Sequence, residues 1–260
     1  FTPKEAADNI VLEFHKYWSD PDEESLAPCV ETAKRLNVPL WMGEGGENNL
    51  QWYTYAFPMY ERLGIGWCFW AYKKMEVPNS PVTFEKPEGW DQITAYLDGR
   101  ERPAPEAAQA IFDRFLNCIS HGEYHPEIIR ALTRRPPLEI PAGAYDAEDI
   151  QSRRSAGAVF RRTSKAALLF ADGHTGEADW RRYGGEAQPE DQKILLCLRE
   201  GDRVGYRVEN LEEKKLRIDV HSYGDGTLNV QNMTAQQGLV WVSCSSGIIN
   251  VESLHITIEE

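Results

Sequence analysis

The sequence predicts two structural classes in succession, an α/β part with a parallel sheet and then an all-β sandwich. Up to residue 132, apolar runs of strand length alternate with amphipathic segments of helical period, which is the pattern of right-handed βαβ crossovers. Beyond the paired prolines at 136–137, short strand-like runs alternate with clusters of Gly, Asp, Ser and Glu, as is typical of antiparallel sandwiches. We therefore expect one domain over residues 1–132 and a second over residues 137–260.

The individual elements follow from apolar periodicity and turn signals. In the first part they are a strand over 9–18, a helix over 24–36, a strand over 38–44, a helix over 50–63, a strand over 64–72, and helices over 90–97 and 105–120. Pro58 should kink the second of these helices. In the second part, strand-like runs lie at 157–162, 166–171, 193–200, 203–209, 215–222, 239–245 and 251–258.

The composition excludes several classes of partner. A length of 260 residues with 42% hydrophobic residues is enough for one large or two medium cores. The net charge of −13 disfavours nucleic acid and anionic membranes, and no apolar run reaches the ~18 residues that a membrane span needs. The five cysteines form no CxxC pair and the six histidines no HExxH motif, so we expect no catalytic metal.

Polar and aromatic residues recur where the three predicted strands of the first part end. His15 and Tyr17 end the first strand, Glu44 ends the second between glycines, and Trp70 and Tyr72 end the third. Because the carboxyl ends of parallel strands meet at one edge of a sheet, these side chains should lie together there. The sequence therefore predicts a functional site around a carboxylate flanked by aromatic rings.

Three short motifs carry a resemblance to a known family. They are "FHKYW" at 14–18, "WMGEGGEN" at 41–48 and "IGWCFWAYKKM" at 65–75. In this order they resemble the ends of the sixth, seventh and eighth strands of family 5 glycoside hydrolases, the cellulase group of (β/α)8 barrels. The resemblance implies an α/β fold for residues 1–132, the C-terminal half of a TIM barrel, and secretion or a place at the cell surface.

The resemblance also implies a reaction and the roles of single residues. The intact protein would be a retaining β-glycoside hydrolase, an endo-β-1,4-glucanase acting on plant-type β-glucan, with a β-mannanase or xyloglucanase of the same family as the alternative. Glu44 would be the nucleophile, oriented by His15 and Tyr17. The implied substrate contacts are Trp70, Asn48 and Lys73.

The family's second catalytic carboxyl has no counterpart in this chain. Retaining hydrolysis needs two carboxyl groups about 5–5.5 Å apart, and in the family the acid/base glutamate follows an asparagine at the fourth strand. No Asn-Glu pair precedes Glu44, and a whole barrel takes ~250 residues. We therefore expect the chain to be inactive alone and to have the N-terminal barrel half as its partner, in the same or a cleaved chain. A non-catalytic carbohydrate-binding protein is the alternative.

The second part resembles carbohydrate-binding modules of the family 6 and 35 type, with "REGDRVGYRVE" at 199–209 as its marker. Gly143 stands where many of those modules have a calcium-binding glutamate, which puts a structural calcium ion in doubt; no other cofactor is expected. Trp180 and Tyr183 lie in the polar stretch 176–186, where burial is not expected. They are our candidates for exposed platforms that stack on sugar rings, with purely structural aromatic residues as the alternative. A sandwich that only braces the first part and binds nothing is a further alternative.

Overall fold

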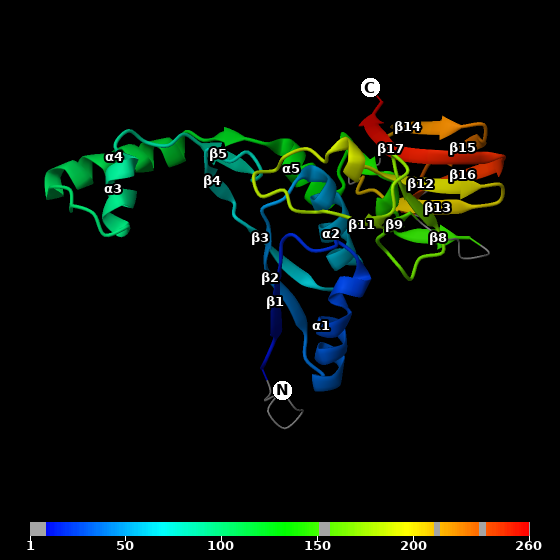
Figure 1. Cartoon of the computed structure of the whole chain (residues 1–260), viewed down its shortest axis with the longest axis horizontal. Coiled ribbons are helices and arrows are strands. Elements are labelled where there is room, and N and C mark those ends of the chain that lie inside the picture. Colours follow the sequence, from blue (N-terminus) through cyan, green and yellow to red (C-terminus); the bar gives the residue numbers. More distant parts are fainter. Residues whose placement is uncertain (1–8, 151–156, 211–213, 234–237, 260) are drawn as a thin grey trace.

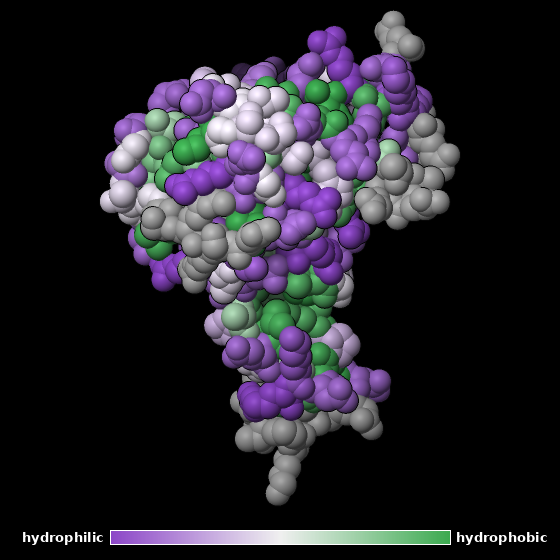
Figure 2. Space-filling view, turned by 90° about the vertical axis from the view of Figure 1, so that its right-hand side faces the viewer, coloured by the Kyte–Doolittle hydropathy of each residue, from purple (hydrophilic) through white to green (hydrophobic). Residues whose placement is uncertain are grey.

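The computed structural model describes residues 9–150, 157–210, 214–233 and 238–259. A small parallel sheet with two helices forms the narrow part of the molecule, and a β-sandwich lies beside its upper end (Figure 1). A third part, with two further helices, projects on the opposite side (Figure 1). Viewed from the sandwich side, hydrophilic side chains cover much of the wide upper part, and a group of hydrophobic ones lies on the narrower part below it (Figure 2).

The parallel sheet has the strand order β1-β2-β3. Its strands are β1 (Leu12–Lys16), β2 (Leu40–Gly46) and β3 (Gly66–Trp70), and the connecting helices are α1 (Glu23–Leu36) and α2 (Leu50–Arg62). Asp22 and Asn49 cap the two helices, because each side chain accepts a hydrogen bond from a first-turn backbone N–H. The helix α2 runs through Pro58.

The two faces of this sheet differ in burial. On one face Phe57 of α2 packs against Trp67 and Phe69 of β3, with ring centroids 4.8 and 5.7 Å apart. On the other face His15 and Trp70 are exposed. The register of both strand pairs is irregular here, between Phe14 and His15 and between Met42 and Gly45, and it places Glu44 opposite His15.

The middle of the chain forms a second small sheet and the projecting part. The sheet has β4 (Lys73–Met75), β5 (Val82–Phe84) and β6 (Glu123–Tyr124), in that order. The projecting helices are α3 (Trp90–Leu97) and α4 (Pro105–Ser120), held together where Trp90 stacks on Phe115 at 4.7 Å. The helix α5 (Pro126–Thr133) returns the chain to α2.

Two antiparallel sheets form the sandwich. One has the order β10-β12-β17-β14 with β7 also paired to β17, and the other has the order β15-β16-β13-β8. The strands and short 3₁₀ helices are β7 (Leu138–Pro141), η1 (Ala142–Ala144), β8 (Ala147–Asp149), β9 (Ala158–Val159), β10 (Ala167–Phe170), β11 (Gly176–Glu177), η2 (Glu190–Gln192), β12 (Ile194–Arg199), β13 (Arg203–Arg207), β14 (Leu216–Gly224), β15 (Thr227–Gln231), β16 (Leu239–Ser246) and β17 (Ile248–Ile258).

One hydrophobic core runs from the helices into the sandwich. Tyr55 of α2 lies edge-on against Phe160 and Trp180 of the sandwich side, with each pair of ring centroids 5.3 Å apart. The sandwich interior continues from there through residues such as Tyr206, whose hydroxyl donates to the carbonyl of Ala142 at 2.7 Å. The two parts are therefore joined by apolar packing.

The predicted fold class, half of a (β/α)8 barrel followed by a jelly-roll-like sandwich, is wrong. The described residues are 27% helix and 35% strand, most strand pairs are antiparallel, and the alternation of parallel strands with helices ends at β3, so the described residues form no barrel. After β3 the chain enters the separate β4-β5-β6 sheet, and α3 and α4 lie away from the parallel sheet (Figure 1). Local periodicity predicted these helices correctly, but it carries no information on which sheet an amphipathic helix packs against.

Candidate functional site

The parallel register brings three predicted residues together at the ends of β1 and β2. His15 is the register partner of Glu44, and Tyr17 follows one residue beyond β1. The Tyr17 hydroxyl donates a hydrogen bond of 2.6 Å to Oε2 of Glu44, and Nδ1 of His15 lies 3.5 Å from the same oxygen. One carboxylate oxygen thus has two ring side chains directed at it.

Burial and the neighbouring carboxylate together keep the Tyr17 hydroxyl protonated. Desolvation first, and then the hydrogen bond to Glu44, raise the pKa of Tyr17 well above its usual range. Tyr17 is therefore a hydrogen-bond donor to the Glu44 carboxylate across the whole physiological pH range.

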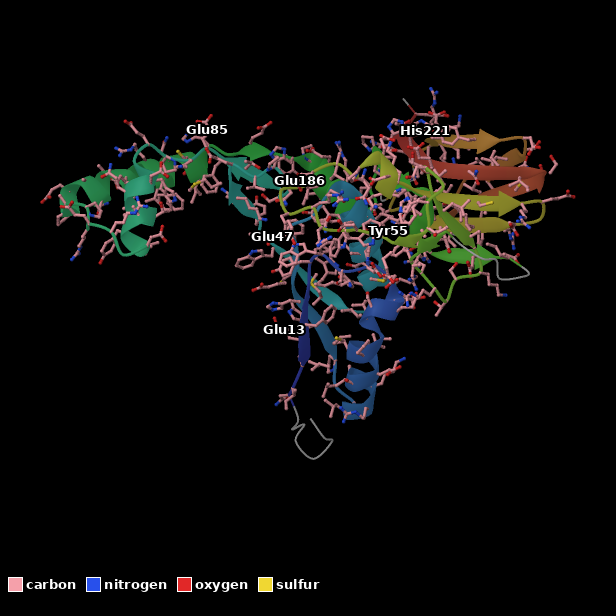
Figure 3. The ribbon with its side chains drawn as sticks, viewed as in Figure 1. Glu13, Glu47, Tyr55, Glu85, Glu186 and His221 are labelled. Carbon is pink, nitrogen blue, oxygen red and sulfur yellow. The ribbon has the colours of Figure 1, made fainter. Side chains whose placement is uncertain are left out.

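A second carboxylate lies on the far side of the His15 ring. Nε2 of His15 is 3.3 Å from Oε1 of Glu13. The Glu13 side chain lies over Gly43, since a Cβ at that position would come within 1.7 Å of Oε1 of Glu13. Figure 3 shows Glu13 and Glu47 on the same flank of the sheet. The two nitrogens of the His15 ring therefore face two different carboxylates, Glu13 and Glu44.

The glycines that follow Glu44 let β2 and β3 approach closely. Gly46 has φ +148°, and a Cβ there would lie 2.3 Å from the carbonyl oxygen of Trp70. Such a contact excludes any larger residue. The glycine-flanked turn that the sequence placed around Glu44 therefore has a structural cause, which is the close packing of the two strand ends.

Exposed aromatic rings flank Glu44 on both sides. At the end of β3, on one side, Trp70 is 47% exposed, and Tyr72, two residues further on, is 62% exposed. Beyond β1, on the other side, Trp18 is 43% exposed, and its ring packs edge-on against Tyr183 with centroids 4.7 Å apart. Because β2 is the central strand, its carboxylate lies between two aromatic groups.

Three of the predicted substrate contacts are engaged within the protein and are not exposed rings beside Glu44. Trp180 was expected to be exposed, but it is 3% exposed and packs against Tyr55 and Phe160, so that expectation is wrong. Asn48 is buried, and Nδ2 donates to the carbonyls of Tyr17 and Trp180. Nζ of Lys73 donates to the carbonyl of Ile119 at 2.9 Å. The structure therefore groups Tyr183 and Trp70 with Glu44, and places the other three in contacts within the protein.

Sequence reasoning missed Trp18 as part of the site. The residue directly follows Tyr17, so an aromatic pair at a strand end was the available signal. It also missed Lys74, whose Nζ lies 2.9 Å from Oε1 of Glu47. Glu47 is thus paired with a cation, whereas Glu44 accepts a hydrogen bond from an uncharged hydroxyl.

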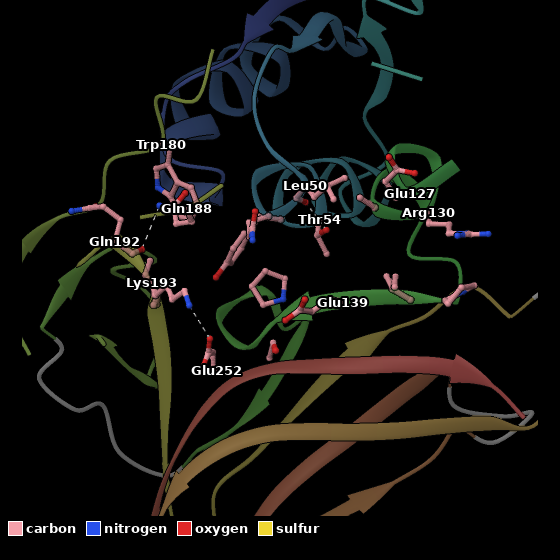
Figure 4. A pocket seen from close by; sticks show the side chains of 18 residues that line it. Leu50, Thr54, Glu127, Arg130, Glu139, Trp180, Gln188, Gln192, Lys193 and Glu252 are labelled. Atoms are coloured by element: carbon pink, nitrogen blue, oxygen red, sulfur yellow. Dashed lines mark hydrogen bonds and ion pairs between the residues drawn. The ribbon is translucent and has the colours of Figure 1, made fainter. Parts of the chain in front are cut away.

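A separate cavity of about 170 Å³ lies between α2, β7 and the 188–194 segment (Figure 4). Leu50, Thr54 and Pro141 line it, and Nζ of Lys193 lies 3.5 Å from Oε1 of Glu252 at its edge. Of the strand-end side chains that the structure describes, neither Glu44 nor its hydrogen-bond partner lines this cavity. It is therefore a second hollow, distinct from the carboxylate site.

No cluster of three or more His, Cys, Asp or Glu side chains suited to a metal ion is found in residues 9–150, 157–210, 214–233 and 238–259. The resemblance places an acidic calcium ligand at the position of Gly143. Gly143 lies against the Tyr55 hydroxyl, and a Cβ added at Gly143 would come within 2.6 Å of that oxygen. Over the same described ranges, no helix combines the length and apolar character needed to cross a membrane.

In comparisons with known proteins, no family model and no curated protein matches the chain.

Proposed function

We propose that the chain carries the nucleophile of a retaining β-glycoside hydrolase, with Glu44 in that role. The observation that carries the proposal is the 2.6 Å hydrogen bond from the Tyr17 hydroxyl to a carboxylate that lies between two groups of exposed aromatic rings. The hydrogen bond from Tyr17 orients the carboxylate that would attack the sugar. Aromatic faces suit both sugar rings and the positive charge that develops at the anomeric carbon.

In the first step, an oxygen of Glu44 forms a bond to the anomeric carbon as the bond from that carbon to the leaving oxygen breaks. The leaving oxygen takes a proton from a second carboxyl group. Water then attacks the same carbon, gives a proton to that second group, and releases Glu44. Tyr17 orients the Glu44 carboxylate through its hydrogen bond in both steps, and His15 lies beside the same oxygen.

We propose that the second carboxyl comes from polypeptide that covers the exposed face of the β1-β2-β3 sheet. This face exposes His15 and Trp70 to solvent, with Trp18 and Tyr72 exposed at the neighbouring strand ends, and grouped exposed aromatic rings mark surfaces that bind a ligand or a partner. The substrate we propose is a plant-type β-1,4-glucan, cut internally by a secreted enzyme, with mannan or xyloglucan as alternatives.

The test uses a sugar that reacts without an acid catalyst. A 2,4-dinitrophenyl 2-deoxy-2-fluoro-β-cellobioside has a leaving group that needs no protonation, so the chain alone should form a stable glycosyl ester. Mass spectrometry should show one added fluorocellobiosyl group, on the peptide that contains Glu44. Glu44→Gln should abolish labelling, and Glu47→Gln, which alters the neighbouring carboxylate, should retain it.

A non-catalytic sugar-binding protein is the second candidate. The exposed rings at both strand ends favour it, because they provide stacking surfaces whether or not a bond is cut. Binding of cello-oligosaccharides without any labelling of Glu44 would support this candidate and would refute the hydrolase.

A further inference from the structure

A loop of the sandwich reaches across to the strand ends that hold Glu44. This sandwich loop (residues 178–189) lies between β11 and η2. Three buried asparagines of the first part donate side-chain N–H groups to its backbone carbonyls. The donors and acceptors are Asn48 to Trp180 at 2.6 Å, Asn49 to Glu186 at 3.1 Å, and Asn79 to Tyr183 at 2.9 Å.

The loop is shaped for this contact. Gly185 has φ +86°, and a Cβ there would lie 2.6 Å from Cβ of Asn79 and 3.4 Å from the carbonyl oxygen of Asn48. Glycine is therefore required both by the backbone conformation and by the closeness of the two segments. Asn48 also donates to the carbonyl of Tyr17, so one amide joins the loop to the residue that hydrogen-bonds Glu44.

The result is an aromatic pair built from both parts of the chain. Tyr183 of the loop and Trp18 of the first part meet edge to face, with centroids 4.7 Å apart and ring planes at 68°. The Trp18 ring also lies 5.7 Å from that of Tyr17. Both members remain about half exposed, at 43% for Trp18 and 54% for Tyr183. An edge-to-face pair leaves ring faces free for a ligand.

We propose that Trp18 and Tyr183 form a sugar-binding subsite beside Glu44, which binds a neutral β-1,4-linked gluco-oligosaccharide. The inference rests on the proposed function in taking Glu44 as the point of cleavage. The sandwich then binds substrate through a loop fixed at the reacting carboxylate. Trp70 and Tyr72, the exposed rings at the end of β3, contact the other end of the same oligosaccharide.

The test measures binding of cellohexaose by titration calorimetry. Trp18→Ala and Tyr183→Ala should each weaken the affinity about tenfold, the usual effect of losing one stacked ring. Tyr183→Phe should bind within about twofold of the wild type, because the ring and not the hydroxyl makes the contact. Tyr223→Ala is the matched control, since Tyr223 is an exposed tyrosine (57%) of the same sandwich, hydrogen-bonded to Glu252.

Two results would overturn the subsite. One is a wild-type protein that does not bind cellohexaose, and the other is wild-type affinity in both alanine variants while their thermal unfolding is unchanged. Labelling of Glu44 separates this inference from the proposed function. Labelling with unaltered cellohexaose affinity in the variants refutes the subsite alone. Weakened affinity in the variants without any labelling of Glu44 refutes the hydrolase and keeps the subsite.

Discussion

Arg134 links the first part of the chain to the sandwich, and replacing its acidic partner should destabilise the whole protein. The guanidinium is 3% exposed and donates to the carbonyl of Thr54 in α2 at 3.0 Å and to that of Ala144 at 2.6 Å. It also forms a hydrogen-bonded ion pair with Asp146. The Asp146 carboxylate accepts a further bond of 2.7 Å from the N–H of Arg207. Asp146→Ala would leave a buried cation without its counter-charge.

The expected cost follows from the burial of the pair. Removing one member of a buried ion pair costs about 3–5 kcal/mol, because the remaining charge is desolvated and unpaired. A cavity of about 180 Å³ adjoins Arg134 and Asp146, and such a polar cavity has room for water that would solvate the guanidinium. We therefore expect Asp146→Ala to lower the free energy of unfolding by about 3 kcal/mol, the lower end of that range.

Urea unfolding followed by circular dichroism measures this change, with the slope checked for two-state behaviour. The neighbouring Arg135 provides the control, since its Nε lies 2.6 Å from Oε2 of Glu209 in an exposed pair. Glu209→Ala should cost less than about 1 kcal/mol. Equal effects of Asp146→Ala and Glu209→Ala would refute the reasoning, and would mean that the buried ion pair stabilises the fold no more than an exposed one.

Three further predictions concern the sheet and its site. Tyr17→Phe should slow labelling of Glu44 about tenfold to a hundredfold, because a charge-assisted hydrogen bond of about 1.5–3 kcal/mol is lost; an unchanged labelling rate would contradict this role. Burial lowers the pKa of Lys16 from 10.5 to about 8, with nearby aspartates opposing the shift. The folded state therefore loses this proton at lower pH than the unfolded state, and the free energy of unfolding should rise on the order of 3 kcal/mol between pH 8 and 10.5. Lys16→Met should remove that rise when the free energy of unfolding is measured by urea titration at each pH. The same pH dependence in the wild type and the variant would contradict this role of Lys16. Gly46→Ala should destabilise the protein on the order of 3 kcal/mol in the same assay, against about 1 kcal/mol for Gly64→Ala, where φ is +67° and no atom lies within 4 Å; similar costs would show that β2 and β3 are less close than described.

Local signals predicted the elements that depend on local chemistry. The helix expected over 50–63 is observed as Leu50–Arg62, because its apolar period and its asparagine cap are both encoded within the segment. The strand expected over 38–44 is observed as Leu40–Gly46. The meeting of His15 with Glu44 followed from a general property of parallel strands, whose carboxyl ends share an edge.

Long-range packing accounts for what the sequence did not predict. Trp180 lies in a polar stretch, and its burial depends on Tyr55 and Asn48, more than 120 residues earlier in the chain. The pairing of Tyr183 with Trp18 has the same origin, since the sandwich loop is positioned by side chains of the first part. The barrel prediction failed for a related reason, because three similar strand ends do not specify what the rest of the chain packs against.

The shared core between Tyr55, Phe160 and Trp180 bears on how such a protein can evolve. Interfaces between independent domains of one chain usually resemble transient contacts and are more polar than a core. A recombination event near residue 136 would instead strip apolar side chains of their neighbours in both products. Selection would then act on the two parts as a single heritable unit, and changes in Tyr55 should be accompanied by compensating changes in Phe160 or Trp180.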